Sequence, residues 1–85
     1  MSERIPSELE RLVLSVHQRN GGRLAALDWQ WRLLEPVLGL DSLDLAEIMV
    51  GIERQYGISP FETSTPPKTW GEVVEVLQDT TRRVL

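Results

Sequence analysis

The sequence contains no cysteine and a single histidine, His17, and these two scarcities exclude several kinds of site. Without thiols the chain has no disulfide, no catalytic thiolate and no iron–sulfur cluster, and one imidazole cannot build a histidine-rich metal centre. No apolar run approaches the roughly 20 residues that a membrane-spanning helix needs, and nothing resembles a signal peptide. We therefore expect a soluble, cytoplasmic protein without a metal site and without membrane insertion.

Basic residues are also scarce, since 9 Lys and Arg stand against 13 Asp and Glu and the formal net charge is -4 at pH 7. This balance argues against nucleic-acid binding, which needs clustered cations. The excess of acidic residues is confined to one half of the chain: residues 1–40 hold five acids and five bases, whereas residues 41–85 hold eight acids and four bases. The acidic half either serves solubility alone or forms a docking face for basic partners.

A chain of 85 residues supports one domain, here residues 1–85, because a folded chain of this size buries only about 60–65% of its unfolded surface. No catalytic constellation is present. Ser42 lacks the flanking glycines of a hydrolase elbow, and His17, the sole candidate base, is expected to be a surface or half-buried helical residue. Asp41 and Asp44 do not form a calcium loop, because Leu43 occupies the third position of such a loop and no glycine stands at the sixth. We expect a binding protein and not an enzyme.

The first half of the chain predicts one helix and a long connection. The capping box Ser7-Glu8-Leu9-Glu10 predicts a helix start, and Asn20-Gly21-Gly22 predicts its end. Residues 23–40 are apolar without a sustained period and contain Pro36, so they predict a packed connection with one helical turn. The inner stripe of the first helix is Leu9, Leu12, Val13 and Val16.

The second half predicts up to three helices. Asp41 is an expected N-cap with Asp44 at N3, and Gly57 ends that helix. A Ser59-x-x-Glu62 box predicts a short helix before Pro66-Pro67, and a Thr69-x-x-Glu72 box opens the last one. The expected inner faces are Leu45, Ile48, Met49, Ile52 and Tyr56, and then Trp70, Val73, Val74, Leu77, Thr81 and Val84, with Arg82 and Arg83 in the final turn.

The stretch Leu38-Gly39-Leu40-Asp41-Ser42-Leu43-Asp44, followed by an amphipathic helix and later by Thr69-Trp70-Gly71, closely resembles the acyl carrier proteins. The resemblance covers most of the chain. It implies an all-α, small four-helix bundle with a long first loop and a short third helix. It also implies that Ser42, between Asp41 and Leu43, receives a 4′-phosphopantetheine arm that holds acyl or polyketide intermediates as thioesters.

The resemblance further implies partners and a cargo site. A phosphopantetheinyl transferase would modify Ser42, and acyltransferases, ketosynthases or other acyl-processing enzymes would dock through basic patches on a monomeric carrier. The implied docking residues on the second helix are Asp41, Asp44, Ala46, Glu47, Val50 and Glu53. The implied lining for a stored acyl chain is Leu34, Ile48, Ile52 and Trp70.

The sequence departs from the family pattern in three places. Pro66-Pro67 falls where the third helix usually runs and leaves its length open. Arg54 stands where an acid is usual, which suggests a narrower partner set, and Trp29 and Trp31 lie in the first loop. In an extended loop the two indoles share a side and would form an aromatic wall near the arm, and in a helix they point apart; packing is the favoured role. The departures favour a specialised secondary-metabolite pathway over fatty-acid synthesis. The alternatives are an unmodified carrier-like interaction module and an aminoacyl or D-alanyl carrier.

Overall fold

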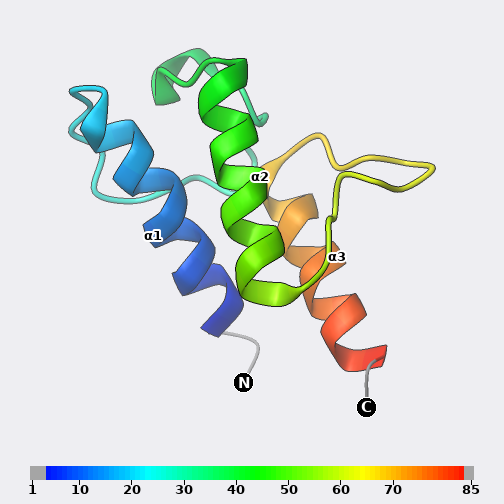
Figure 1. The fold of residues 1–85 in the computed structure, drawn as a ribbon. Helices are drawn as coiled ribbons and strands as arrows, with labels where there is room; N and C mark the ends of the chain where they lie inside the picture. The colour runs from blue at the N-terminus through cyan, green and yellow to red at the C-terminus, as the bar shows by residue number, and fades with distance from the viewer. Residues whose placement is uncertain (1–3, 84–85) are drawn as a thin grey trace.

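The computed structural model describes the backbone of residues 4–83 and the side chains of residues 4–80. It contains three α-helices, α1 (Arg4–Arg19), α2 (Ser42–Tyr56) and α3 (Trp70–Arg83), and one turn of 3-10 helix, η1 (Pro36–Leu38) (Figure 1). No strand occurs in this part of the chain, where Arg32 and Thr69 form one isolated β-bridge. The expected positions of Thr81, Arg82, Arg83 and Val84 on the inner face or in the last turn lie outside the described side chains.

The three helices form two antiparallel pairings around α1, which packs against both α2 and α3. The start of α1 and the end of α3 lie at one end of the molecule, and the end of α1, η1 and the start of α2 lie at the other (Figure 1). Residues 57–69 connect α2 to α3 as an extended loop that projects from the side of the helices. The predicted long connection with one helical turn is confirmed by residues 20–41, which contain only η1.

The expected four-helix bundle is wrong, because the short third helix predicted between the Ser59 box and Pro66-Pro67 does not form. A single turn is present there, in which the Glu62 N–H donates to the Ser59 carbonyl at 3.2 Å. The following residues up to Pro66 are exposed Thr and Ser, which favour turns over helix and bury no apolar face. Pro60 and Pro67 are instead buried and anchor the two ends of the loop.

The prediction that the first helix begins at the Ser7 box is wrong by about one turn, since α1 begins at Arg4. Pro6 lies in the first turn, where its missing N–H costs nothing because the first four N–H groups of a helix have no intrahelical partner. Arg4 Nε also donates to Glu8 Oε2 at 3.1 Å, one turn further along. The predicted stop is confirmed: α1 ends at Arg19, and Gly21 has a φ of 94°.

Leucine and tryptophan residues of the long connection complete a core that the three helices cannot close alone. Burial of such side chains is the main source of stability in a domain of this size. The buried apolar residues are Leu9, Val13, Leu14 and Val16 of α1, Ile48 and Ile52 of α2, Trp70, Val73, Val74 and Leu77 of α3, and Leu27, Leu38 and Leu40 of the connection.

Carbonyl groups of the connection cap the start of α3. The Trp70 N–H donates to the Trp31 carbonyl at 3.2 Å, and the Gly71 N–H donates to the Trp29 carbonyl at 2.8 Å. These two N–H groups belong to the first helical turn and have no partner within the helix. Trp29 and Trp31 therefore act in the fold through their backbone as well as through their half-buried rings.

The predicted Thr69 box forms with one change. Thr69 Oγ1 accepts from the Glu72 N–H at 3.2 Å, as expected. The Glu72 carboxylate reaches past Thr69 and accepts from the Lys68 N–H at 2.8 Å. Both interactions supply acceptors to N–H groups at or just before the start of α3.

Candidate functional site

The start of α2 is the predicted site, and its capping box forms as expected. The Asp44 N–H donates to Asp41 Oδ1 at 2.8 Å, and the Asp41 N–H donates to Asp44 Oδ2 at 3.2 Å. Ser42 is the first residue of α2 and its side chain is exposed. The helix ends at Gly57, which has a φ of 72° and donates to the Glu53 carbonyl at 2.8 Å, as the sequence predicted.

The chain before Ser42 is held by two buried leucines with a left-handed glycine between them. Leu38 is completely buried and Leu40 is 9% exposed. Gly39 has a φ of 63° and donates to the Pro36 carbonyl at 3.1 Å. A side chain at position 39 would meet no atom within 4 Å, so the requirement for glycine is conformational. This turn directs the chain from η1 into α2.

His17 fastens the same turn to α1. It is 5% exposed, which corrects the expectation of a surface or half-buried residue. The Leu24 N–H points at His17 Nε2 at 3.1 Å, and a backbone N–H can only donate, so Nε2 accepts and Nδ1 carries the proton. That proton is donated to the Leu38 carbonyl at 2.7 Å. A Cβ on Gly22 would lie 2.0 Å from His17 Cε1, so glycine is needed there for close approach.

Two of the predicted docking acids, Asp44 and Glu47, are already engaged by the end of α1. Arg19 donates to both oxygens of Glu47, at 2.8 and 2.9 Å, and to Asp44 at 3.4 Å, while Asn20 donates to Asp44 at 2.8 Å. The Asp41 N–H and the Asn20 amide lower the pKa of Asp44 below its ordinary value, and the Arg19 guanidinium lowers the pKa of Glu47. Both carboxylates are therefore ionised, and their charge is shared with a cation of the same chain.

The role of Arg19 and Asn20 was not predicted. They lie more than 20 positions before their partners in the chain, and only the antiparallel packing of α1 on α2 brings them together. Polar residues are common at the end of a helix, so nothing in the sequence marks these two as partners of α2.

The other predicted docking residues are exposed: Asp41 at the N-cap of α2, and Ala46, Val50 and Glu53 on the helix. Val50 is 51% exposed, and Leu43, beside Ser42, is 78% exposed. Positions 43, 46 and 50 follow i, i+3 and i+7 spacing and share one face of the helix. An apolar stripe flanked by acids therefore runs down α2 from Ser42; the structure supplies this surface, and its role in docking stays a prediction.

The four residues of the predicted cargo site do not line one surface. Ile48, Ile52 and Trp70 are completely buried in the core, whereas Leu34 is 45% exposed on the connection. Trp70 Nε1 is buried and has no hydrogen-bond partner. The three buried residues fill the space between the helices in this structure, and an acyl pocket at this place stays a prediction.

Trp29 and Trp31 are half-buried and pack against the core, in agreement with the favoured packing role. They lie in a turn and not in an extended segment, so the geometry assumed for an aromatic wall is absent.

Comparisons with known proteins return no relative: no family model, no curated protein and no solved structure matches the chain. Over residues 4–83 no helix is long and apolar enough to cross a membrane. In the same part of the chain, no group of three or more His, Asp or Glu side chains is placed to hold a metal ion.

Proposed function

We propose that Ser42 is the attachment site of a 4′-phosphopantetheine group and that the chain is a carrier of acyl or polyketide intermediates. The observation that supports this proposal is the position of Ser42. Its hydroxyl is exposed at the first residue of α2, and the chain before it is anchored by the buried Leu38 and Leu40. A modifying enzyme can reach such a hydroxyl without opening the fold.

The residues around Ser42 fit a phosphodiester. Within the described residues, the N–H groups of Ser42 and Leu43 have no hydrogen-bond partner, and both belong to the first turn of α2. Such N–H groups and the positive end of the helix dipole favour an anion. The Asp41 carboxylate accepts from the Asp44 N–H and so leaves these two N–H groups free.

Each part of the site has a separate task. The group supplies, when attached, the thiol that forms thioesters, which a chain without cysteine cannot supply itself. The turn at Gly39 and the His17 hydrogen bond to Leu38 hold the start of α2 in place. His17 cannot serve as a base for Ser42, because it is buried and both its ring nitrogens are hydrogen-bonded. Activation of the hydroxyl therefore falls to the transferase.

The proposal is tested by incubating the purified chain with coenzyme A and a promiscuous phosphopantetheinyl transferase and measuring the intact mass. The wild-type chain is expected to gain the mass of one phosphopantetheine group, and Ser42→Ala is expected to gain none. Ser64→Ala, which removes an exposed hydroxyl from the 57–69 loop, is the matched control and should be modified like the wild type. Equal modification of Ser42→Ala, or none of the wild type, refutes the proposal.

A second candidate is an interaction module that has the carrier-like motif and is never modified. The exposure of Leu43 and Val50 on one face of α2 favours it, since exposed large apolar side chains commonly mark binding surfaces. Failure of the wild-type chain to gain mass would leave this candidate in place of the carrier.

A further inference from the structure

A shallow groove lies between α1 and α2 on the side of the molecule away from α3. We call it the α1/α2 groove and define it by Arg11, Leu12, Val50, Gly51 and Arg54. The groove consists of two hollows of about 410 and 440 Å³, and Leu12 lines both of them. Gly51 has no side chain and leaves Leu12 uncovered; a Cβ there would lie 3.2 Å from Leu12 Cδ2.

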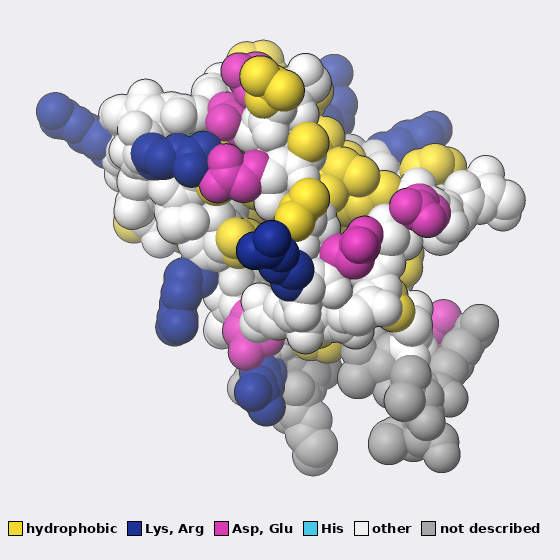
Figure 2. Space-filling view, viewed as in Figure 1, with side chains coloured by type: hydrophobic (Ala, Val, Ile, Leu, Met, Phe, Trp, Pro, Cys, Tyr) yellow, Lys and Arg dark blue, Asp and Glu magenta, His cyan; other side chains and the backbone are white. Residues whose placement is uncertain are grey.

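The floor of the α1/α2 groove is apolar and open to solvent. Val50 is 51% exposed and Leu12 is half-buried. Figure 2 shows small hydrophobic areas between α1 and α2, with Lys or Arg and Asp or Glu side chains around them; the larger hydrophobic area in that view lies toward the 57–69 loop. An apolar groove between two helices is a common seat for the apolar side of an amphipathic helix.

The acids that border the groove are already paired with donors of the same chain. Glu8 accepts from Arg4 at 3.1 Å and from the Tyr56 hydroxyl at 2.6 Å, and these two bonds lower its pKa. Glu47 accepts from the two terminal guanidinium nitrogens of Arg19, Nη1 and Nη2. These carboxylates already have cationic or hydroxyl donors, so a basic partner would have to displace them.

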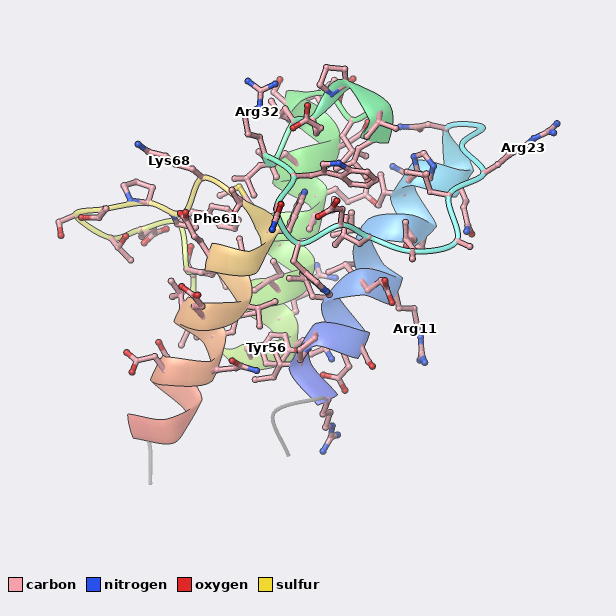
Figure 3. All side chains as sticks on the ribbon, turned by 180° about the vertical axis from the view of Figure 1, so that it is seen from behind. Arg11, Arg23, Arg32, Tyr56, Phe61 and Lys68 are labelled. Carbon is pink, nitrogen blue, oxygen red and sulfur yellow. The ribbon has the colours of Figure 1, made fainter. Side chains whose placement is uncertain are left out.

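The bases that border the groove are not neutralised. Arg11 and Arg54 are exposed and make no ion pair or hydrogen bond with any described residue. Arg11 projects from the outer side of α1 (Figure 3), and Arg54 belongs to the last turn of α2. Arg11 therefore borders one hollow and Arg54 borders the other, and neither is paired with a described residue, although the chain as a whole is acidic.

We infer that the α1/α2 groove binds an acidic amphipathic helix of another protein. Apolar side chains of that helix would cover Leu12 and Val50 above Gly51, and carboxylates on its flanks would pair with Arg11 and Arg54. Complementary charge sets the partner and the rate of association, and burial of the apolar floor supplies most of the affinity. The inference goes beyond the carrier role and does not depend on modification of Ser42.

Two synthetic peptides test this inference by NMR titration of the full, unmodified ¹⁵N-labelled chain. Both are about four helical turns long and have the same leucine stripe, with glutamates on the flanks of one and lysines on the flanks of the other. The acidic peptide is expected to bind at least about tenfold more tightly, to lose affinity with added salt, and to shift the amide signals of Leu12, Val50 and Gly51. Equal binding of the two peptides, tighter binding of the lysine peptide, or no binding overturns the inference.

Charge-reversed variants locate the contact. Arg11→Glu combined with Arg54→Glu is expected to weaken the acidic peptide about tenfold or more. Arg23→Glu is the matched control, because Arg23 is an exposed base that points away from the groove (Figure 3). Val50→Ser, which keeps the charges and removes the apolar contact, should weaken binding as well. An equal effect of Arg23→Glu, or self-association of the chain through these residues in sedimentation, contradicts a partner protein in the groove.

Discussion

The contact between His17 and Gly22 should dominate the stability of the turn that leads into α2. His17→Ala removes a ring that donates to the Leu38 carbonyl at 2.7 Å and accepts from the Leu24 N–H at 3.1 Å. Gly22→Ala places a methyl group 2.0 Å from the ring, so the ring must move and both bonds must break. Both substitutions therefore remove the two hydrogen bonds of the His17 ring: His17→Ala deletes the ring, and Gly22→Ala displaces it.

The size of the destabilisation by His17→Ala follows from the burial of the ring. At 5% exposure, the loss of the ring leaves a buried carbonyl without a donor, at about 1–3 kcal/mol, and a space in the packing, at about 2 kcal/mol. We expect His17→Ala to lower the free energy of unfolding by about 3–5 kcal/mol. A chain of this length has about 4–13 kcal/mol in total. Overpacking by Gly22→Ala should cost about 1–3 kcal/mol.

Chemical denaturation followed by circular dichroism and tryptophan fluorescence measures all these values. In the double variant the methyl group enters the space left by the ring, so Gly22→Ala should cost almost nothing once His17 is alanine. The expected coupling is about 1–3 kcal/mol. Arg11→Ala, an exposed residue of α1 that makes no hydrogen bond with any described residue, is the matched control and should change stability by less than about 0.5 kcal/mol. Additive costs in the double variant, or a cost of His17→Ala no larger than that control, would refute the reasoning.

Three further variants test other parts of the account. The hydrogen bond from Tyr56 lowers the pKa of Glu8 below its ordinary value of 4.5. The stability that this bond contributes is therefore present above that pH and is lost as the pH falls through the folded-state pKa. In Tyr56→Phe, NMR titration should show a higher Glu8 pKa, and an unchanged pKa would contradict the bond. In Gly39→Ala, alanine must take the left-handed φ of 63°, which should lower the free energy of unfolding measured by denaturation by about 1–2 kcal/mol. An unchanged free energy of unfolding would contradict the role of this turn. Gly71→Ala brings a Cβ to 2.9 Å from the Trp29 carbonyl and should both destabilise the chain and shift its tryptophan emission; an unaltered spectrum and midpoint would contradict the capping of α3.

Local signals in the sequence were enough to predict the start of α2. Asp41 and Asp44 are three positions apart and Gly57 follows the helix, so the cap and the stop depend on neighbouring residues alone. The Ser59 box was a local signal of the same kind and failed. A capping box stabilises a helix that has an apolar face to bury, and the residues after Glu62 have none.

Contacts between segments far apart in the chain could not be predicted from the sequence. The His17 bond to Leu38 and the Arg19 pair with Glu47 join residues more than 20 positions apart, through the antiparallel packing of α1 on α2. Periodicity shows which face of a helix is buried, but not which helix covers it. The sequence therefore predicted acids on the face of α2, and only the structure shows that a base of α1 already pairs with Glu47.

The central claim is that Ser42 accepts phosphopantetheine, and peptide mapping after the transferase reaction tests it most directly. Trypsin cleavage after Arg32 and Arg54 releases residues 33–54, in which Ser42 is the sole hydroxyl-bearing side chain. The account predicts that this peptide alone gains the mass of one phosphopantetheine group. An unmodified 33–54 peptide, or the added mass on any other peptide, would contradict it.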